Sequence, residues 1–278
     1  MKAVFSLLNT AAPLLLLTLG ALSSEYGGRL AMFMECIINL SGFFCFAFTV
    51  WTGNIFLGIV LSVFVCTLMV FLMERLSSKF GANMFLASLA MNLLFAAGTT
   101  FFSSVFFETR GVLTSEAFKF DAAVARSATS VLCYGLSAVL LFFLLCTRSG
   151  MILRITGSDS DVLEARGISA QKYKCASWLI AAFCGAICGG TLAIRISSFV
   201  PGMSGGRGWT ALAAVFLSRK NGALVPLAVA VFAIAEYAST RLQFVGIPSG
   251  ILLALPYIMS LLLIALVPGK SGTGDDRG

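Results

Sequence analysis

The hydrophobic positions of this chain fall into long apolar blocks separated by short polar segments. A membrane-spanning helix needs about 20 consecutive apolar residues. Eight blocks reach or approach this length: 5–22, 30–50, 53–73, 84–106, 127–146, 175–196, 222–237 and 249–267. The pattern predicts an all-α fold, a polytopic membrane helix bundle with about eight full spans. Because no small-x-small cleavage pattern precedes Ser23, we read the first block as a retained span rather than a signal peptide.

A ninth apolar stretch, 209–218, is too short to cross a bilayer alone. It follows 201–208, Pro-Gly-Met-Ser-Gly-Gly-Arg-Gly, a backbone too rich in glycine for a lipid-facing helix. Irregular backbone at membrane depth is tolerated only where it is buried in protein or lines a cavity. We therefore expect a short helix inside the bundle, and favour a version that crosses the membrane over one that dips in and returns.

The long polar island of the chain is the segment 147–174, which the flanking spans force out of the bilayer. Lysine and arginine accumulate on the cytoplasmic side of membrane proteins. With this segment in the cytoplasm, that side holds Arg29, Arg75, Lys79, Arg148, Arg154, Arg166, Lys172, Lys174, Arg219, Lys220, Lys270 and Arg277. The other side holds Lys2, Arg110, Lys119, Arg126, Arg207 and Arg241, with Arg195 near a span end. This orientation places the C-terminus in the cytoplasm.

Composition excludes several classes of function. The chain is 59% hydrophobic and 11% charged, with a mean hydropathy of +0.97, whereas soluble domains carry about 25% charged residues. The net charge of +7 follows from the orientation and requires no nucleic acid. Histidine is absent, which removes the commonest metal ligand and general base. The eight cysteines lie in or beside apolar blocks and are expected to act as small hydrophobes.

We therefore expect neither an enzyme, nor a metal or cofactor site. The tail contains Gly269-Lys270-Ser271, but the glycine that a phosphate-binding loop needs five positions before its Gly-Lys pair is replaced by Ile264. The chain is accordingly expected not to bind ATP.

Two acids stand within apolar blocks, Glu35 and Glu236. Such a group faces the interior of the bundle or a hydrated path, so each either contacts the transported substrate or joins helices by hydrogen bonds. Asn39 follows Glu35 by one helical turn, and Ser88 and Asn92 share a face of another block. For Asn92 we favour a hydrogen bond to a neighbouring helix.

Small residues recur at helical spacing in block 175–196, at Ala181, Gly185, Gly189 and Ala193. Such a stripe lets helix backbones approach closely, within the bundle or against a partner subunit. Most of the 25 phenylalanines are expected to face lipid or neighbouring helices. A channel lined by them for a flat aromatic ligand is the less favoured alternative.

Four stretches resemble the permease subunits of ATP-binding-cassette (ABC) importers for branched-chain amino acids, sugars, nucleosides and riboflavin, and the nucleoside and riboflavin permeases most. They are Thr147–Lys174, Gly202–Val215, Phe232–Gln243 and Ile247–Tyr257. Glu35 stands where the family carries Asn-Ile-Gly-x-Glu-Gly, but Ala31, Phe33 and Cys36 depart from that motif.

The resemblance implies a single transmembrane permease domain over 1–278, with a cytoplasmic coupling loop at 147–174, the short helix 209–218 and a polar tail at 268–278. A coupling helix within 159–166 would contact a cytoplasmic ABC ATPase. Its residues would be Ser158, Asp159, Asp161, Glu164, Ala165, Arg166 and Gly167. Ser158 or Asp159 suits its N-cap, and Gly167 its end. The substrate pathway would include Glu35, Asn39, Ser88, Asn92, Trp209 and Glu236.

The resemblance also implies a bacterial inner-membrane location, a second permease subunit and an extracytoplasmic solute-binding protein. The expected substrate is a heterocycle bearing a ribose or ribityl chain, a purine nucleoside or riboflavin, with sugars and branched-chain amino acids as alternatives. The altered motif at Glu35 favours one half of a heterodimer with a paralogue. Two other classes remain open: a secondary transporter driven by an ion gradient through Glu35 and Glu236, and a membrane scaffold that transports nothing.

Overall fold

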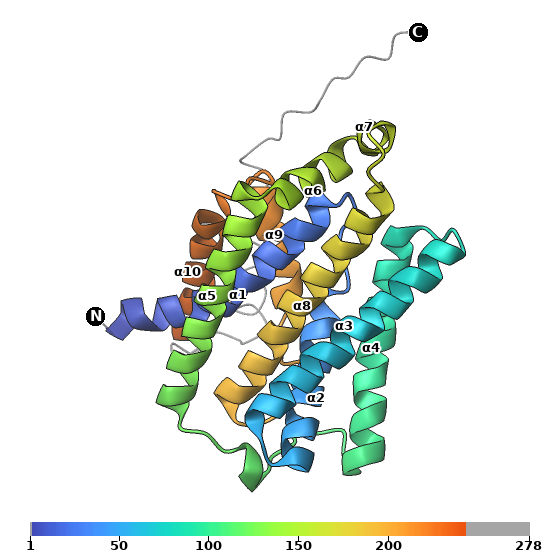
Figure 1. The fold of residues 1–278 in the computed structure, drawn as a ribbon. Helices are drawn as coiled ribbons and strands as arrows, with labels where there is room; N and C mark the ends of the chain where they lie inside the picture. Colours follow the sequence, from blue (N-terminus) through green and yellow to red (C-terminus); the bar gives the residue numbers. More distant parts are fainter. Residues whose placement is uncertain (1, 243–278) are drawn as a thin grey trace.

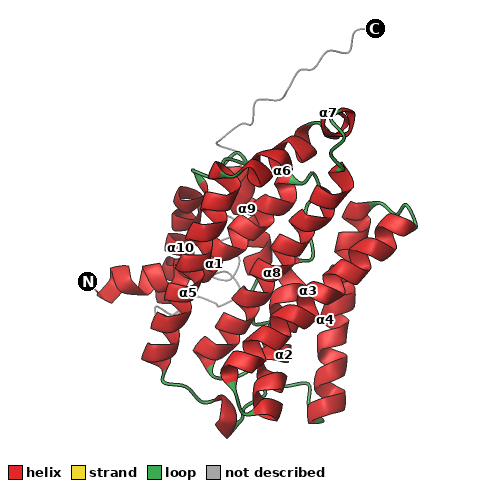
Figure 2. Ribbon diagram, in the orientation of Figure 1, coloured by secondary structure: helices red, strands yellow, loops and turns green. Residues whose placement is uncertain are grey.

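The structure is a computed structural model that describes residues 2–242. The predicted span 249–267, the tail 268–278 and the Gly269-Lys270-Ser271 sequence lie outside the described residues. Over residues 2–242 the chain is helical, and its only β-type pairing is an isolated bridge between Leu113 and Phe199. Figure 2 shows these helices joined by loops, so the predicted all-α class is confirmed for this part of the chain.

The helices follow the predicted blocks closely. In order they are α1 (Lys2–Tyr26), α2 (Met34–Thr52), α3 (Ile55–Lys79), α4 (Met84–Phe107), the 3-10 turn η1 (Glu116–Phe118), α5 (Ala122–Cys146), α6 (Arg148–Ser158), α7 (Ser160–Ala165), α8 (Ala170–Ile196), α9 (Arg207–Leu217) and α10 (Val225–Leu242). Six of them, α1 to α5 and α8, are long and apolar enough to span a membrane, and α9 and α10 carry shorter apolar segments. A helical bundle is confirmed, and the total of about eight spans stays a prediction.

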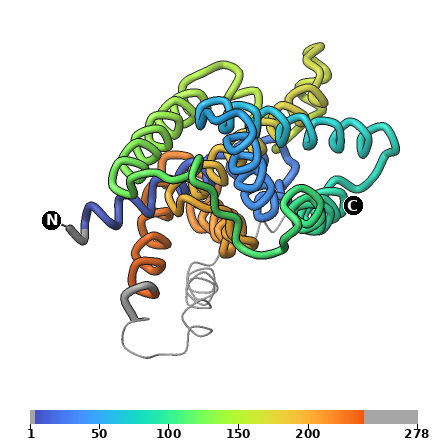
Figure 3. Tube along the Cα trace, turned by 90° about the horizontal axis from the view of Figure 1, so that it is seen from below, coloured from blue at the N-terminus to red at the C-terminus, as the bar shows by residue number. Residues whose placement is uncertain are grey.

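Helix α8 forms the centre of the bundle and packs against α1, α2 and α3 (Figure 1). Seen end-on, α4 and α10 lie on opposite sides of it (Figure 3). Burial decreases from the centre outward: 72% of the span window of α8 is buried, but only 22% of the windows of α3 and α4. The outer helices therefore present apolar side chains such as Phe64 and Leu93 outward, as lipid contact requires.

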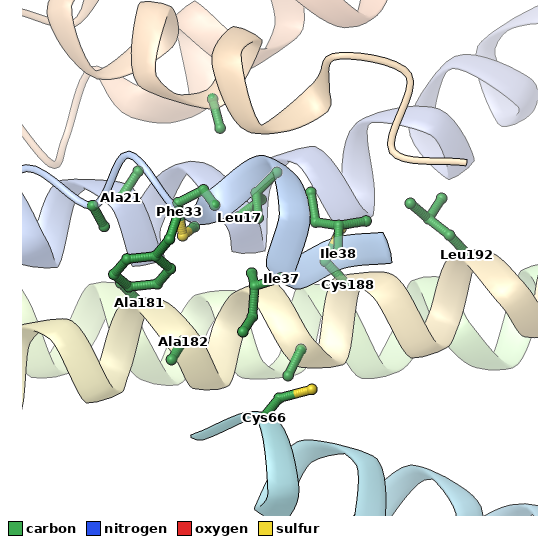
Figure 4. Close-up of a cluster of buried hydrophobic side chains, with 14 of the residues drawn as sticks. Leu17, Ala21, Phe33, Ile37, Ile38, Cys66, Ala181, Ala182, Cys188 and Leu192 are labelled. Atoms are coloured by element: carbon green, nitrogen blue, oxygen red, sulfur yellow. The ribbon is translucent and has the colours of Figure 1, made fainter. Parts of the chain in front are cut away.

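The core forms where α1, α2, α3 and α8 meet. Figure 4 shows side chains from these four helices converging: Leu17, Ala21, Phe33, Ile37, Ile38, Cys66, Ala181, Ala182, Cys188 and Leu192. A Cβ on Gly185 would lie 2.5 Å from Ile37, and one on Gly189 would overlap the carbonyl oxygen of Ile38 and the hydroxyl of Ser41. The predicted close approach is therefore confirmed, and its partner is α2 of the same chain.

The two ends of the bundle differ in charge. One end, called here the α7 end, carries α6, α7 and the contacts of Tyr26 with Lys220 and of Arg29 with Glu74. Described basic residues at this end are Arg29, Arg75, Lys79, Arg148, Arg154, Arg166, Lys172, Lys174, Arg219 and Lys220. The opposite end and the region beside it carry Arg110, Lys119, Arg126, Arg195 and Arg207. This imbalance favours a cytoplasmic α7 end, and the orientation stays a prediction.

Candidate functional site

A break in the regular helices lies deep in the bundle, where α2 and α9 both begin. Helix α8 ends at the end of the bundle opposite to α7. Residues 197–206 then lead back into the bundle, and α9 begins at Arg207. Glu35, in the first turn of α2, accepts hydrogen bonds at Oε1 from the Ser204 hydroxyl (2.6 Å) and the Gly206 N–H (2.8 Å). Its Oε2 accepts from the Gly208 N–H (2.8 Å). Glu35 therefore caps α9 from another helix, where carboxylates are favoured by the helix dipole.

Two of the glycines in this turn are required by its geometry. Gly206 has φ = +83°, in the left-handed region that residues with a Cβ rarely adopt. A Cβ on Gly208 would overlap the backbone of Glu35. Asn39 lies on α2 one helical turn after Glu35 and bonds to the same segment. Its Nδ2 donates to Ser204 Oγ (2.8 Å), and its Oδ1 accepts from the Ser204 N–H (3.2 Å).

Helix α4 supplies the acceptors that the start of α2 lacks. The N-cap residue of α2 is Phe33, whose side chain cannot accept a hydrogen bond. Ser88 Oγ accepts from the Phe33 N–H (3.2 Å), and Asn92 Oδ1 accepts from the Cys36 N–H (3.1 Å). The hydrogen bond expected for Asn92 is confirmed, and α2 is thereby able to begin inside the bundle without unsatisfied N–H groups at these two positions.

The other two predicted pathway residues lie on the α9–α10 side. Glu236 of α10 forms a half-buried ion pair with Arg207, the first residue of α9. Trp209 is partly buried and packs against the main core. The structure thus gathers Glu35, Asn39, Ser88 and Asn92 around the start of α2 and sets Trp209 and Glu236 apart on α9 and α10. Whether they line a substrate pathway stays a prediction.

The segment 147–174 is almost entirely helical. Asp159 separates α6 from α7 and caps α7, accepting from the N–H groups of Asp161 (3.1 Å) and Val162 (3.3 Å). At the other end Gly167, with φ = +73°, and Ile168 donate to the carbonyls of Glu164 (2.9 Å) and Leu163 (2.9 Å). These two bonds make a Schellman C-cap. Ser158, the other N-cap candidate, instead ends α6 and donates to the Ile155 carbonyl (3.2 Å).

Only one side chain anchors α7 to the bundle. Leu163 is 2% exposed, whereas the remaining α7 residues from 161 to 165, together with Arg166 and Gly167, are exposed. This capped helix of six residues is packed against the bundle through one leucine, so most of its surface is available for contact with another protein. Its function in coupling stays a prediction.

Tyr26 connects α6 to α9 at the α7 end. The guanidinium of Arg154 lies 5.1 Å from the centre of the Tyr26 ring. The Tyr26 hydroxyl donates to the Lys220 carbonyl (2.8 Å) and accepts from the Gly222 N–H (3.2 Å), just beyond the end of α9. On the α6 side, a Cβ on Gly157 would lie 2.5 Å from the Tyr26 carbonyl oxygen. The start of α9 is bonded to Glu35 in the middle of the bundle, and the residues after its end are bonded to Tyr26 at the α7 end. Helix α9 therefore connects these two places.

A cavity of about 1020 Å³ opens beside this junction at the α7 end. Among the described residues of its lining, basic groups outnumber acidic ones, since Arg29, Arg154, Lys174 and Lys220 face a single acid, Glu25. Among the described residues, no group of three potential metal ligands comes together anywhere.

Comparison with known proteins assigns the family. The family model described as "Branched-chain amino acid transport system / permease component" matches residues 3–268. The chain belongs to this family of ABC permeases. The match extends over both regions described above, the turn at mid-bundle and the segment 147–174.

Individual relatives of the permease are distant. It is 24% identical to the nucleoside ABC transporter permease protein NupC of Lactococcus lactis, over 96% of this chain and 92% of that one. It is also 24% identical to TsgC13 of Haloferax volcanii, provisionally named a glucose ABC transporter permease, over 84% of this chain and 76% of that one. PsaBC from Streptococcus pneumoniae, solved in complex with a Fab, has the same fold: TM-score 0.59, 14% identity, 96% of this chain and 93% of that one.

Several polar contacts of the permease were missed by the sequence interpretation. Glu74, just beyond the apolar block 53–73, is fully buried and pairs with Arg29 (2.7 Å). Arg195 bonds to Thr129, Ser130 and the Asn9 carbonyl. A signal for the last contact was present, because a proline in a helix frees the carbonyl four residues earlier, and Pro13 stands four residues after Asn9.

Proposed function

We propose that this permease forms one half of the membrane channel of an ATP-driven importer, and that α7 receives the motion of a cytoplasmic ATPase. The observation that carries the proposal is the geometry of α7: a helix capped at both ends, held by Leu163 and otherwise exposed from Asp161 to Ala165. Such a helix transmits a push as a rigid body. A gradient-driven carrier has no need of a docking helix of this kind, which disfavours that alternative.

The contacts around Tyr26 connect α7 and α6 to α9 and could transmit such a displacement. Movement of α6 would displace Tyr26 through Arg154 and Gly157, and Tyr26 would displace the end of α9 through Lys220. Helix α9 would then move the turn 201–206 against Glu35. Coupling between two distant sites requires contacts that differ between two states, and the Glu35 hydrogen bonds are the contacts proposed to change.

The substrate proposed is a heterocycle that bears a ribose or ribityl chain, with a sugar as the alternative. The naming of NupC as a nucleoside permease and the provisional naming of TsgC13 as a glucose permease support these two classes. The second permease subunit is proposed to be a paralogue that retains more of the Glu35 motif, and a solute-binding protein would deliver the substrate. Mass spectrometry of small molecules that co-purify with that binding protein tests the substrate class.

Reversal of one charge on α7 tests the coupling function. Glu164 is exposed and its side chain plays no part in either cap, so Glu164→Lys is expected to leave the fold intact. It should weaken contact with the ATPase and lower uptake about tenfold, the change that a loss of roughly 1.4 kcal/mol in binding produces.

The control is Glu116→Lys, the same charge reversal at an exposed acid of the opposite end, whose ion-pair partner Lys119 is also exposed. It should leave uptake and substrate-stimulated hydrolysis of ATP unchanged. Equal uptake by the Glu164→Lys and wild-type permeases at equal expression would remove α7 from the coupling mechanism.

A further inference from the structure

A second polar cavity lies on the side of the turn that faces away from the α7 end. Its volume is about 570 Å³, and residues from α1, α5, α8, α9 and α10 line it. Charged residues in its lining are Arg126, Arg195, Arg207 and Glu236. Among the described residues of the lining, three guanidinium groups against one carboxylate leave two positive charges in excess. A cavity of this charge within a membrane protein needs an explanation, because an uncompensated charge near the bilayer is costly.

The proline of α1 helps to explain why Arg195 points into this region. Pro13 lacks the N–H that would bond the Asn9 carbonyl within the helix. Arg195 NH1 donates to that carbonyl (2.6 Å), while its Nε and NH2 donate to the hydroxyls of Thr129 (2.8 Å) and Ser130 (2.8 Å). The guanidinium is thus fixed by three neutral acceptors from two neighbouring helices.

None of these acceptors neutralises the charge of Arg195. Within residues 4–239, where side chains are described, Arg195 and Arg126 have no acidic side chain within ion-pair distance, and Glu236 lies against Arg207. An arginine carries five N–H donors, and three of those on Arg195 are occupied by the bonds described above. Arg126 stands exposed at the same cavity.

We propose that this cavity binds a small anion, a phosphate or carboxylate group, between Arg195 and Arg126. The guanidinium fork matches the oxygens of both anions and bonds them more strongly than neutral acceptors do. Arg195 is held in advance by Asn9, Thr129 and Ser130, so little side-chain freedom is lost when the anion binds. Arg207 lies beside them, so that the bound anion would also face the first residue of α9.

The site is independent of the solute proposed above and of coupling through α7. The anion has two possible sources, a water-borne ion or solute and the headgroup of an anionic lipid. Both present the same oxygens to the same arginines, so the chemistry at the site is shared and the experiment separates the sources.

The test measures thermal unfolding of the full-length permease in its purified transporter complex. In neutral detergent, inorganic phosphate is titrated against chloride at equal ionic strength, since a ligand that binds the folded state raises the melting temperature. In a second arm, nanodiscs of phosphatidylcholine are compared with nanodiscs that contain phosphatidylglycerol. Binding rather than uptake is read out, so the result does not depend on the proposed substrate or on the ATPase.

Arg126→Gln is the decisive variant, because Arg126 is exposed and the substitution should not disturb the fold. We expect it to weaken phosphate binding about tenfold, as loss of one charge-assisted hydrogen bond does. Arg110→Gln, an exposed arginine at the same end outside the cavity, should bind as the wild type. Stabilisation by phosphatidylglycerol alone, lost in Arg126→Gln, assigns the site to a lipid headgroup. No stabilisation by either anion, or the same stabilisation in both variants, overturns the proposal.

Discussion

Glu35 shows how an acid in an apolar block can serve the backbone of a distant segment. Both of its oxygens accept hydrogen bonds from residues 204–208. Its sequence position suggested either a substrate contact or a bond between helices, and the second of these is observed. The residues around Glu35 differ from the family motif, but the carboxyl is kept. The backbone uses both of its oxygens, because Gly206 and Gly208 donate to different ones.

Replacement of this carboxyl by an amide is expected to destabilise the permease. In Glu35→Gln an NH2 group takes the place of one oxygen and faces the N–H of Gly208 or of Gly206. An unsatisfied buried donor costs about 1–3 kcal/mol, so the melting temperature in detergent should fall. Glu116→Gln, an exposed acid, is the control. Equal melting of the Glu35→Gln and wild-type proteins would contradict the capping function.

Gly208 gives a second prediction at this scale. Gly208→Ala inserts a methyl group into the backbone of Glu35, and overpacking of this kind costs about 1–3 kcal/mol. Gly135→Ala on α5 has no atom within 4 Å of the new Cβ and should be neutral or slightly stabilising, because alanine favours a helix. Thermal unfolding of the two variants should therefore diverge, and a similar result for both would mean that the turn can move away from α2.

At the scale of elements, α9 is a short helix tied at both ends. Glu35 holds its start, and Tyr26 holds the backbone just beyond its end. The glycines before it and its short apolar length predicted this element, and the count of lysines and arginines favoured its crossing. In the structure residues 197–217 run from the opposite end to the α7 end. The contact with Tyr26 had no sequence signal, since residues 26 and 220 are far apart in the chain.

Loss of one hydroxyl should separate motion at α6 from motion of α9. Tyr26→Phe removes the bonds to Lys220 and Gly222 but keeps the ring beneath Arg154. If α9 carries the coupling, uptake per ATP hydrolysed should fall several-fold, while each lost hydrogen bond costs stability only about 1 kcal/mol. Tyr134→Phe, which loses a bond to the Leu8 carbonyl, should keep the wild-type ratio. A wild-type ratio in Tyr26→Phe as well would exclude this route.

Hydrophobic length predicted the spans better than it predicted their ends. The helix predicted at 175–196 begins earlier, at Ala170, and the polar segment before it contains α6 and α7. These two short helices are capped by Thr147, Asp159 and Gly167, and hydropathy does not detect such caps. The pairing of Ser88 and Asn92 with α2 could not be predicted in detail, since it depends on α2 beginning within the bundle.

At the scale of the whole molecule, the charge difference between the two ends predicts which end faces the cytoplasm, and cysteine labelling tests this orientation. Ala165 on α7 and Ala117 in η1 are both exposed and lie at opposite ends. In a Cys146→Ser background, which removes the exposed cysteine, a membrane-impermeant maleimide added to intact cells should label Ala117→Cys and spare Ala165→Cys. Permeabilised cells should label both. The reverse pattern in intact cells would invert the orientation and remove α7 from the reach of any cytoplasmic ATPase.

The half-length crossing at 197–217 also constrains how the permease is made. Lipid offers no hydrogen-bond partners to the glycine turn, and α9, with 11 residues, is shorter than the roughly 20 that a free-standing span requires. Its first N–H groups find their acceptor on Glu35, a residue synthesised about 170 positions earlier. During biogenesis α9 therefore cannot partition into the bilayer by itself, and its insertion must wait until α2 has been retained nearby to receive it.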